Sequence, residues 1–135
     1  MVGGNAGTID LILVTLRMLR ELGCQLPVEL WHLAREMSPY YERRLREFQV
    51  TLRRFDEPDL LVPAERKIGL EKNFNLKVAA WVNTRFEEFI ALDSDVLPVR
   101  DPTYLFETDE YKRTGQIFWP DWWKTDAGTV LTYMI

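Results

Sequence analysis

The residues of this sequence best suited to chemistry are two aspartates separated by one residue, Asp93 and Asp95. They end the apolar run Phe89–Leu92. In an extended chain, side chains two residues apart point to the same side, so both carboxylates can bind one hard cation such as Mg²⁺ or Mn²⁺, while Ser94 faces away. Two carboxylates leave most coordination positions for water and for the phosphates of a nucleotide. We therefore predict a divalent-metal site that accepts a nucleotide-bound ligand.

The stretch Phe89–Asp95 is predicted to be a strand buried on both faces in a parallel sheet. It is a short apolar run between a helical pattern and Pro98. Ligands of open α/β sheets bind outside the carboxyl ends of the strands. We therefore expect Asp93 and Asp95 to lie at that edge of the sheet.

The rest of the chain alternates helical and strand patterns, which is typical of an α/β fold in a single domain. Helix starts are indicated by the N-cap residues Thr8, Ser38 and Asp101, and Gly23 ends the first helix. The segment Gln49–Phe55 is predicted to be a short strand, with a continued helix as the alternative. The other expected helices are Ile9–Leu22, Pro39–Phe48, Asn75–Phe86 and Pro102–Phe106, and the other expected strands are Pro27–Trp31 and Gln116–Trp119.

Two further features are suited to bind phosphate. The glycine-rich start, with Gly3, Gly4 and Gly7 ahead of a helical pattern, can bring backbone N–H groups to a phosphate, although a flexible chain end is an equally good interpretation. Lys77 lies one turn into the helix before the acidic strand, where it could neutralise a diphosphate. A surface lysine is the alternative, and spacing alone favours it.

A cluster of aromatic residues near the end of the chain is suited to bind a sugar. Trp119, Trp122 and Trp123 flank Asp121, so the rings could stack on a sugar while the carboxylate accepts hydrogen bonds from its hydroxyl groups. A structural core cluster is the competing interpretation, and we rate it slightly higher from the residues alone.

Histidine and arginine side chains allow functional and structural interpretations. The single histidine, His32, follows a predicted strand, but a structural hydrogen-bonding role is more common for a lone histidine than catalysis or metal binding. Five arginines resemble an anion-binding patch, but the neighbouring acidic residues indicate solvated, charge-paired surfaces. These arginines are Arg43, Arg44, Arg46, Arg53 and Arg54.

The composition excludes several classes of protein. A net charge of -4 argues against a protein that binds nucleic-acid polymers or anionic membranes. The single cysteine, Cys24, cannot form a disulfide within the chain. The apolar stretch Ile9–Leu19 contains charged residues and is too short to cross a bilayer, and we see no cleavable signal peptide.

Other functions fit parts of the aspartate motif. A calcium loop fails, because Leu97 and Pro98 stand where a ligand and a glycine are needed. A phosphohydrolase of the haloacid-dehalogenase type also places two aspartates after an apolar strand, but it needs a lysine and an acidic cluster well downstream. An inactive remnant or binding module is the third possibility.

Four segments in order resemble the fungal α-mannosyltransferases of glycosyltransferase family 71. They are Gly3-Gly4, Leu16–Leu33, Leu76–Phe106 and Thr114–Trp123, which together cover most of the chain. The resemblance implies a Rossmann-like fold of the GT-A type and a nucleotide-sugar donor, GDP-mannose in the best-known members. It also implies a Mn²⁺ ion and transfer of mannose, with retention of configuration, to a mannose-containing glycan in the Golgi lumen.

The resemblance also implies roles for individual residues. Asp93 and Asp95 become ligands of the metal and the diphosphate. The donor side would comprise Gly3, Gly4, Lys77 and Ser94, and the sugar or acceptor side would comprise Trp119, Asp121 and Trp122. No nucleophile or catalytic base is assigned.

The chain departs from the family pattern in two respects. Val96 stands where an asparagine often follows the acidic pair. The family also implies a strand before Gly3, a membrane anchor before that strand and an acceptor-binding half after Trp123. We therefore expect this chain to be a part of such an enzyme, truncated at both ends.

Overall fold

The computed structural model describes residues 1–3, 5, 7–64 and 75–119. These residues form four α-helices, one 3₁₀ helix and two strands. In chain order they are α1 (Ile9–Glu21), β1 (Val28–His32), α2 (Pro39–Arg46), β2 (Val50–Arg54), α3 (Asn75–Asn83), the 3₁₀ helix η1 (Pro102–Glu107) and α4 (Asp109–Thr114). The chain divides into two compact units, Met1–Thr103 and Tyr104–Ile135.

The sheet of the first unit consists of β1 and β2, which pair in parallel from Val28 opposite Val50 to His32 opposite Arg54. The start of the chain runs along the other edge of β1. There Val2 forms an isolated parallel bridge with Trp31. Met1 O accepts a hydrogen bond from Trp31 N at 2.9 Å, and Gly3 N donates one to Trp31 O at 2.9 Å. The predicted strands at Pro27–Trp31 and Gln49–Phe55 are thus confirmed within one residue at each end.

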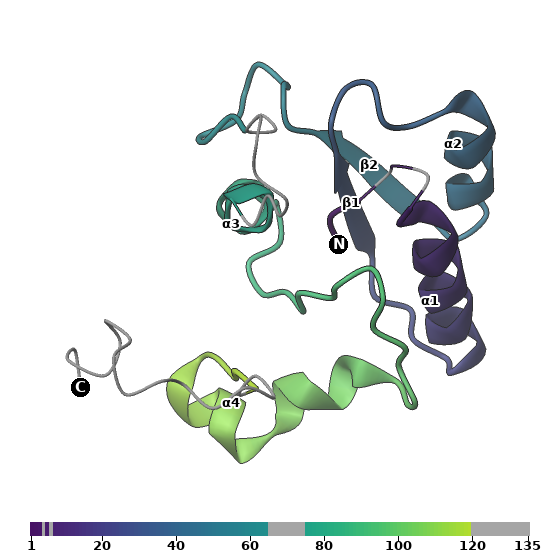
Figure 1. The fold of residues 1–135 in the computed structure, drawn as a ribbon. Helices are drawn as coiled ribbons and strands as arrows, with labels where there is room; N and C mark the ends of the chain where they lie inside the picture. The colour runs from purple at the N-terminus through teal and green to yellow at the C-terminus, as the bar shows by residue number, and fades with distance from the viewer. Residues whose placement is uncertain (4, 6, 65–74, 120–135) are drawn as a thin grey trace, which may run out of the picture. The chain divides into compact units, whose positions relative to one another are not determined.

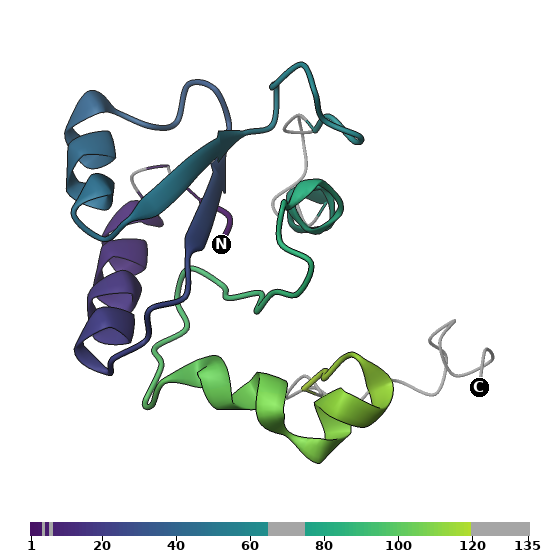
Figure 2. The ribbon, with the colours of Figure 1, turned by 180° about the vertical axis from the view of Figure 1, so that it is seen from behind.

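Helices α1 and α2 cover one face of this sheet, as Figures 1 and 2 show from opposite sides. The core on that face consists of Ile9, Ile12 and Leu16 from α1, Leu30 from β1 and Leu45 from α2, all 0% exposed. Because side chains alternate along a strand, Leu30 faces these helices while Glu29 and Trp31 face the opposite way.

Helix α3 lies against the other face of the sheet (Figures 1 and 2). Ala79 and Ala80 of α3 pack against Trp31 and Phe55 in a second buried cluster. The two rings lie 5.4 Å apart between their centroids. Small alanine side chains let the helix approach the two rings closely.

The predicted helix boundaries depend on local hydrogen bonds. Ser38 accepts a hydrogen bond from Tyr41 N at the start of α2, which confirms it as the N-cap. Thr8 occupies the N-cap position of α1 without capping through its side chain. Instead, Asn5 O accepts hydrogen bonds from Thr8 N and Ile9 N. Gly23, with φ of +89°, follows the end of α1 in the left-handed conformation that glycine favours.

Helix α3 ends at Asn83 and not at Phe86 as predicted. The Asn83 side chain is 8% exposed and bonds to the loop that precedes α3. Its Oδ1 accepts hydrogen bonds from Leu61 N and Val62 N, and its Nδ2 donates to Val62 O. These long-range bonds fix the end of the helix, and helical spacing alone cannot reveal them.

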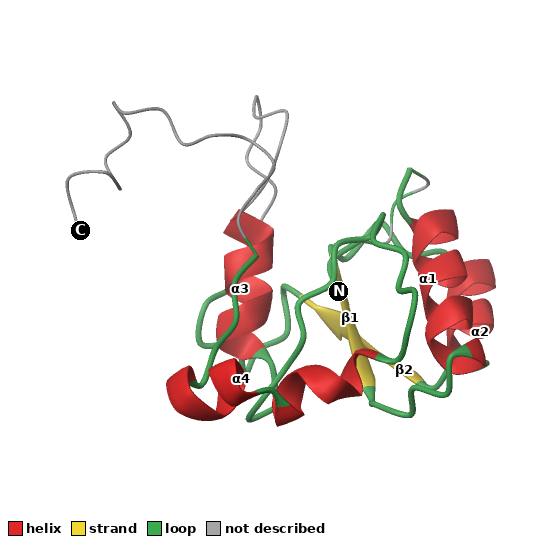
Figure 3. Ribbon diagram, turned by 90° about the horizontal axis from the view of Figure 1, so that it is seen from below, coloured by secondary structure: helices red, strands yellow, loops and turns green. Residues whose placement is uncertain are grey.

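The predicted strand Phe89–Asp95 is not present. The described chain from residue 84 to residue 101 contains no helix or strand, and Figure 3 shows it as loop. Phe89 and Val96 are each 41% exposed. The apolar composition suggested burial on both faces, but a strand also needs hydrogen-bonding partners, and this segment pairs with none of the described strands. The prediction was therefore wrong at this segment.

The predicted strand Gln116–Trp119 in the second unit is also wrong. These residues have no regular secondary structure, and Phe118 is 76% exposed. A short run of apolar residues does not make a strand without a neighbour to pair with. The predicted cap of the preceding 3₁₀ helix is confirmed, because Asp101 Oδ1 accepts a hydrogen bond from Thr103 N at 3.0 Å.

The structure is consistent with the predicted α/β class, since a parallel strand pair is covered by helices on both faces. Within the described ranges, none of the helices combines the length and apolar character needed to cross a bilayer.

Candidate functional site

Asp93 and Asp95 lie in one turn. Val96 N donates a hydrogen bond to Asp93 O at 3.2 Å, which closes a four-residue turn with Ser94 and Asp95 at its centre. Both aspartates are exposed, and Ser94 is half-buried. The expected extended geometry, in which the two carboxylates point to the same side of a strand, is therefore replaced by a turn. We call residues Asp93–Val96 the aspartate turn.

Lys77 is brought to the aspartate turn by α3. Its Nζ lies 2.6 Å from Asp93 Oδ1, and both side chains are partly exposed. The sequence singled out Lys77 from its place in the helix before the acidic segment, and the structure brings these two residues together. A cation held beside the carboxylates adds positive charge where a diphosphate is predicted to bind.

Asp93 of the aspartate turn lies close enough to the Met1 α-amino group to interact with it electrostatically. Burial lowers the pKa of the Met1 α-amino group to about 6, and the carboxylates of Glu29 and Asp93 oppose that shift. The same amino group donates a hydrogen bond to Glu29 O at 2.9 Å. The sequence placed Asp93 beyond the carboxyl end of a strand. Because no strand leads to Asp93 in the described chain, that predicted position is not realised.

Gly3 is buried where the chain start crosses α1. A Cβ atom at Gly3 would lie 2.6 Å from Ile12 Cδ1, so a larger residue does not fit without movement in the core. Its N–H group already donates to Trp31 O. The N–H group of Gly7 likewise donates to Asn5 Oδ1. Gly4, the other predicted donor-side glycine, lies outside the described residues.

The predicted sugar side belongs to the second unit. Trp119 is 66% exposed, so this ring is not part of a core cluster. Asp121 and Trp122 lie outside the described residues. The role of these three residues in binding a sugar stays a prediction.

The structure favours structural roles for His32 and for three of the five arginines. His32 is 5% exposed, and its Nδ1 lies 3.0 Å from Leu33 O. Three of the five arginines form ion pairs with nearby acids. These pairs are Arg44 with Glu47, Arg53 with Glu29 and Glu57, and Arg54 with Asp56.

A buried polar cluster on the α3 side of the sheet was not found from the sequence. Glu29 Oε2 accepts hydrogen bonds from Trp31 Nε1 at 3.1 Å and from Thr84 Oγ1 at 2.8 Å. Arg53 Nη1 lies 3.6 Å from Glu29 Oε1, and the guanidinium lies over the Trp31 ring at 4.7 Å. A signal was present, because opposite charges occur on two adjacent predicted strands, but their register was unknown.

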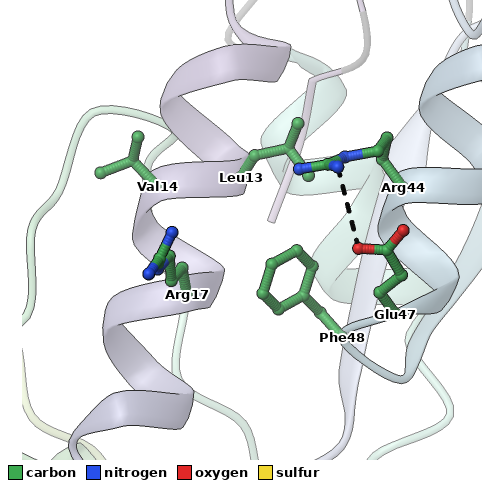
Figure 4. Close-up of a pocket in the computed structure, with 6 residues that line it drawn as sticks. All are labelled: Leu13, Val14, Arg17, Arg44, Glu47 and Phe48. Atoms are coloured by element: carbon green, nitrogen blue, oxygen red, sulfur yellow. Dashed lines mark ion pairs between the residues drawn. The ribbon is translucent and has the colours of Figure 1, made fainter.

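A shallow groove of about 410 Å³ lies between α1 and α2 (Figure 4). Its lining combines apolar and charged side chains, namely Leu13, Val14, Arg17, Arg44, Glu47 and Phe48. Arg44 pairs with Glu47 across 4.0 Å. None of the predicted site residues lines this groove.

The aspartate turn supplies two metal ligands at most from its own carboxylates. Among the described residues, no group of three or more histidine, cysteine, aspartate or glutamate side chains is arranged to hold a metal ion. The chemistry of two exposed carboxylates still fits Mg²⁺ or Mn²⁺, provided that water and a bound diphosphate complete the coordination shell. By themselves, two carboxylates leave most of such a coordination shell to other ligands.

Comparison with known proteins points to one family. The model of the family described as "Mannosyltransferase putative" matches residues 1–133. Alpha-1,2-mannosyltransferase MNN23 of Candida albicans is 35% identical over 82% of this chain, and MNN2 of the same species is 32% identical over 91%. Alpha-1,2-mannosyltransferase MNN2 of Saccharomyces cerevisiae is 26% identical over 91% of the chain.

The chain spans only about a fifth of these relatives, since the matches cover 19% of MNN23 and 20% of either MNN2. No solved structure matches the chain.

Proposed function

Because the chain belongs to this mannosyltransferase family, whose model matches residues 1–133, we propose that it is the donor-binding part of a metal-dependent α-mannosyltransferase. The donor is GDP-mannose, and the acceptor is a mannose-containing glycan of glycoproteins. The relatives are named alpha-1,2-mannosyltransferases, so the linkage made is α-1,2 with retention of the donor's configuration. The compartment of action is the fungal Golgi lumen.

The family match over nearly the whole chain carries this proposal. The geometry of the aspartate turn supports it, because Asp93 and Asp95 are both exposed in one turn and Lys77 Nζ lies 2.6 Å from Asp93 Oδ1. A phosphohydrolase gains no such support, either from the family match or from a buried strand before the aspartates.

In the proposed site, Asp93 and Asp95 hold the metal, and Lys77 pairs with an oxygen of the diphosphate. When bound, the metal offsets the negative charge that builds up on the leaving nucleoside diphosphate. Lys77 also neutralises negative charge of the diphosphate, because its ammonium group is a point charge on a flexible side chain. To do so, its ammonium group leaves Asp93 and pairs with a phosphate oxygen. Ser94, at the centre of the turn, can donate a hydrogen bond to the donor.

Trp119, Asp121 and Trp122 are proposed to contact the sugar or the acceptor. An exposed tryptophan ring offers an apolar face to a sugar, and a carboxylate accepts hydrogen bonds from its hydroxyl groups. The 66% exposure of Trp119 supports this reading.

Calorimetry tests the proposal directly. The chain is titrated with GDP-mannose in the presence and absence of Mn²⁺, with UDP-glucose as the competing donor. We expect binding of GDP-mannose that requires Mn²⁺, and a loss of affinity of at least about ten-fold in Asp95→Asn. Lys77→Met should weaken binding by a smaller factor, about three- to ten-fold, because the metal ligands remain.

Asp109→Asn is the matched control, because Asp109 is an exposed aspartate in the second unit and away from the aspartate turn in sequence. It should bind the donor as the wild type does. Absence of any Mn²⁺-dependent binding in the wild-type chain, or equal binding by Asp95→Asn, would contradict the proposal and favour an inactive binding module.

A further inference from the structure

The loop that carries the aspartates has no regular secondary structure to hold it. Between the end of α3 at Asn83 and the start of η1 at Pro102, the chain forms neither helix nor strand. A metal site nevertheless needs its ligands held within about 0.5 Å of a productive geometry. The contacts that hold this loop must therefore come from side chains of other elements.

The first anchor lies at the start of the loop and belongs to β1. Glu29 is 7% exposed, and its carboxylate accepts a hydrogen bond from Thr84 Oγ1 at 2.8 Å and one from Arg85 N at 3.4 Å. Glu29 itself is fixed by Trp31 Nε1 and by the ion pair with Arg53, which is 5% exposed. Side chains of β1 and β2 therefore fix the position of Glu29, and Glu29 holds the start of the loop.

The second anchor lies at the end of the aspartate turn and belongs to α1. Thr15 is 0% exposed, and its Oγ1 lies 2.9 Å from Val96 O and 3.1 Å from Leu11 O. Its single hydroxyl proton is shared between these two acceptors. Val96 is also the residue whose N–H group closes the aspartate turn onto Asp93 O.

The two anchor residues, Thr15 and Glu29, are among the few polar or charged side chains that are buried in the described chain. Among the described residues, the buried polar or charged side chains are Thr15, Glu29, His32, Arg53 and Asn83. Glu29 binds the start of the loop, Thr15 binds it at the end of the aspartate turn, and Arg53 pairs with Glu29. Polar groups are costly to bury, so two that converge on one loop indicate that its position matters.

We propose that Thr15 and Glu29 are positioning residues that hold the aspartate turn, and with it Asp93 and Asp95, in the geometry that binds a divalent cation with its nucleotide. The inference rests on the proposed function for the identity of the ligand. The anchoring itself rests only on the contacts above.

Amide hydrogen exchange measures the anchoring without any ligand. Thr15→Val keeps the shape of the side chain and removes its hydroxyl group, whereas Thr15→Ser keeps the hydroxyl group. At the Glu29 anchor, Thr84→Val removes the hydroxyl group that donates to Glu29, and Thr84→Ser keeps it. Both substitutions leave the buried Glu29–Arg53 pair intact. Loss of one net hydrogen bond should speed exchange of the Val96 amide in Thr15→Val by about five-fold, and Thr15→Ser should restore most of the protection.

Thr51→Val is the matched control, because Thr51 is an exposed residue of β2 and makes no hydrogen bond to the loop among the described residues. It should leave exchange of the Val96 amide unchanged. Amides of β1 should exchange at wild-type rates in all variants, which shows that the fold is intact. Unchanged exchange at residues 85–96 in both valine variants, with a folded protein, would overturn the proposal.

Electron paramagnetic resonance of added Mn²⁺, with GDP as the nucleotide, measures the consequence for the site. We expect affinity for Mn²⁺ to fall about three- to ten-fold in the valine variants and to recover in the serine variants. Faster exchange with unchanged Mn²⁺ affinity would show that the anchors serve stability only, and would overturn the proposal. A wild-type chain that binds no Mn²⁺ refutes the proposed function instead, and the exchange data then decide the anchoring separately.

Discussion

At the scale of single residues, Arg53 shows how one charged side chain serves several partners. Its guanidinium is 5% exposed, lies over the Trp31 ring and pairs with Glu29 at 3.6 Å and with Glu57 at 2.8 Å. A buried cation without partners would be strongly destabilising. Two carboxylates and an aromatic face compensate for part of its lost hydration, while Nη1 makes no hydrogen bond to the described residues. Of these partners Glu57 is the more exposed, so it can be changed with least disturbance.

The lowered pKa of Glu57 leads to a prediction about the free energy of unfolding at acidic pH. Burial raises the pKa of its carboxyl group. Hydrogen bonds from Arg54 N and the Arg53 side chain lower the pKa by more than burial raises it, so the folded-state pKa lies below the usual 4.5. A lowered pKa means that the unfolded chain binds the proton more tightly. The stabilisation is thus fully present above the unfolded-state pKa and is lost as the pH falls through the folded-state value.

We therefore expect Glu57→Gln to lower the free energy of unfolding by about 1 kcal/mol at neutral pH and by much less at about pH 3.5. Urea denaturation of both proteins at the two pH values measures this. Equal differences at both pH values would show that the Glu57 charge contributes nothing.

At the scale of elements, α1 shows why helical spacing predicted so much of this fold. Ile9, Ile12 and Leu16 are 0% exposed and Leu19 is 3% exposed, whereas Leu11 and Val14 are 45% and 49% exposed. One stripe of the helix faces the sheet, and the rest faces solvent. Leu16 and Leu11 therefore carry the same side chain on the same helix, but Leu16 is buried and Leu11 is exposed to solvent.

These two leucines provide a matched pair. Leu16→Ala should lower the free energy of unfolding by about 2–5 kcal/mol, because it removes buried methyl groups and leaves a cavity. Leu11→Ala should cost less than about 1 kcal/mol, because its side chain is partly in water already. Chemical denaturation monitored by circular dichroism compares them. Similar losses in both variants would mean that α1 does not pack on this face.

At the scale of the whole molecule, the buried core of the described residues belongs to the first unit. In the part of the chain that the structure describes, every buried apolar side chain lies between Ile9 and Ala80. The second unit, Tyr104–Ile135, contributes α4 and a T-shaped contact of 5.4 Å between the rings of Phe106 and Tyr111, but no buried residue among those described. The two units therefore carry different parts of the function proposed here: the aspartate turn belongs to the first and Trp119 to the second.

This division predicts the result of a truncation. A chain that ends at Thr103 should unfold cooperatively, with a midpoint within about 5 °C of the full chain, because both clusters of the core are retained. It should also retain Mn²⁺ binding through Asp93 and Asp95. Differential scanning calorimetry tests the first expectation, and loss of cooperative unfolding would show that the core depends on residues after Thr103.

Much of the first unit was predictable from local sequence. The start of α2 follows from Ser38 and Pro39, and the end of α1 follows from Gly23. The end of α2 was predicted at Phe48 and lies at Arg46. Strand β1 follows from a short, partly β-branched run between turn residues, and β2 confirms the strand that we preferred over a continued helix. These features depend on residues close together in the chain, so a local pattern is sufficient to detect them. The family resemblance was equally detectable, and the match over residues 1–133 confirms it.

The chemical character of the site was also contained in the sequence, in the types and order of Lys77, Asp93 and Asp95. Tertiary structure alone decided how these residues are held. The apolar run before Asp93 finds no strand to pair with and becomes a loop, which Glu29 and Thr15 anchor from 55 and 81 residues away in the chain. Hydrogen bonds over such separations depend on how the chain folds back on itself, and no local pattern encodes that.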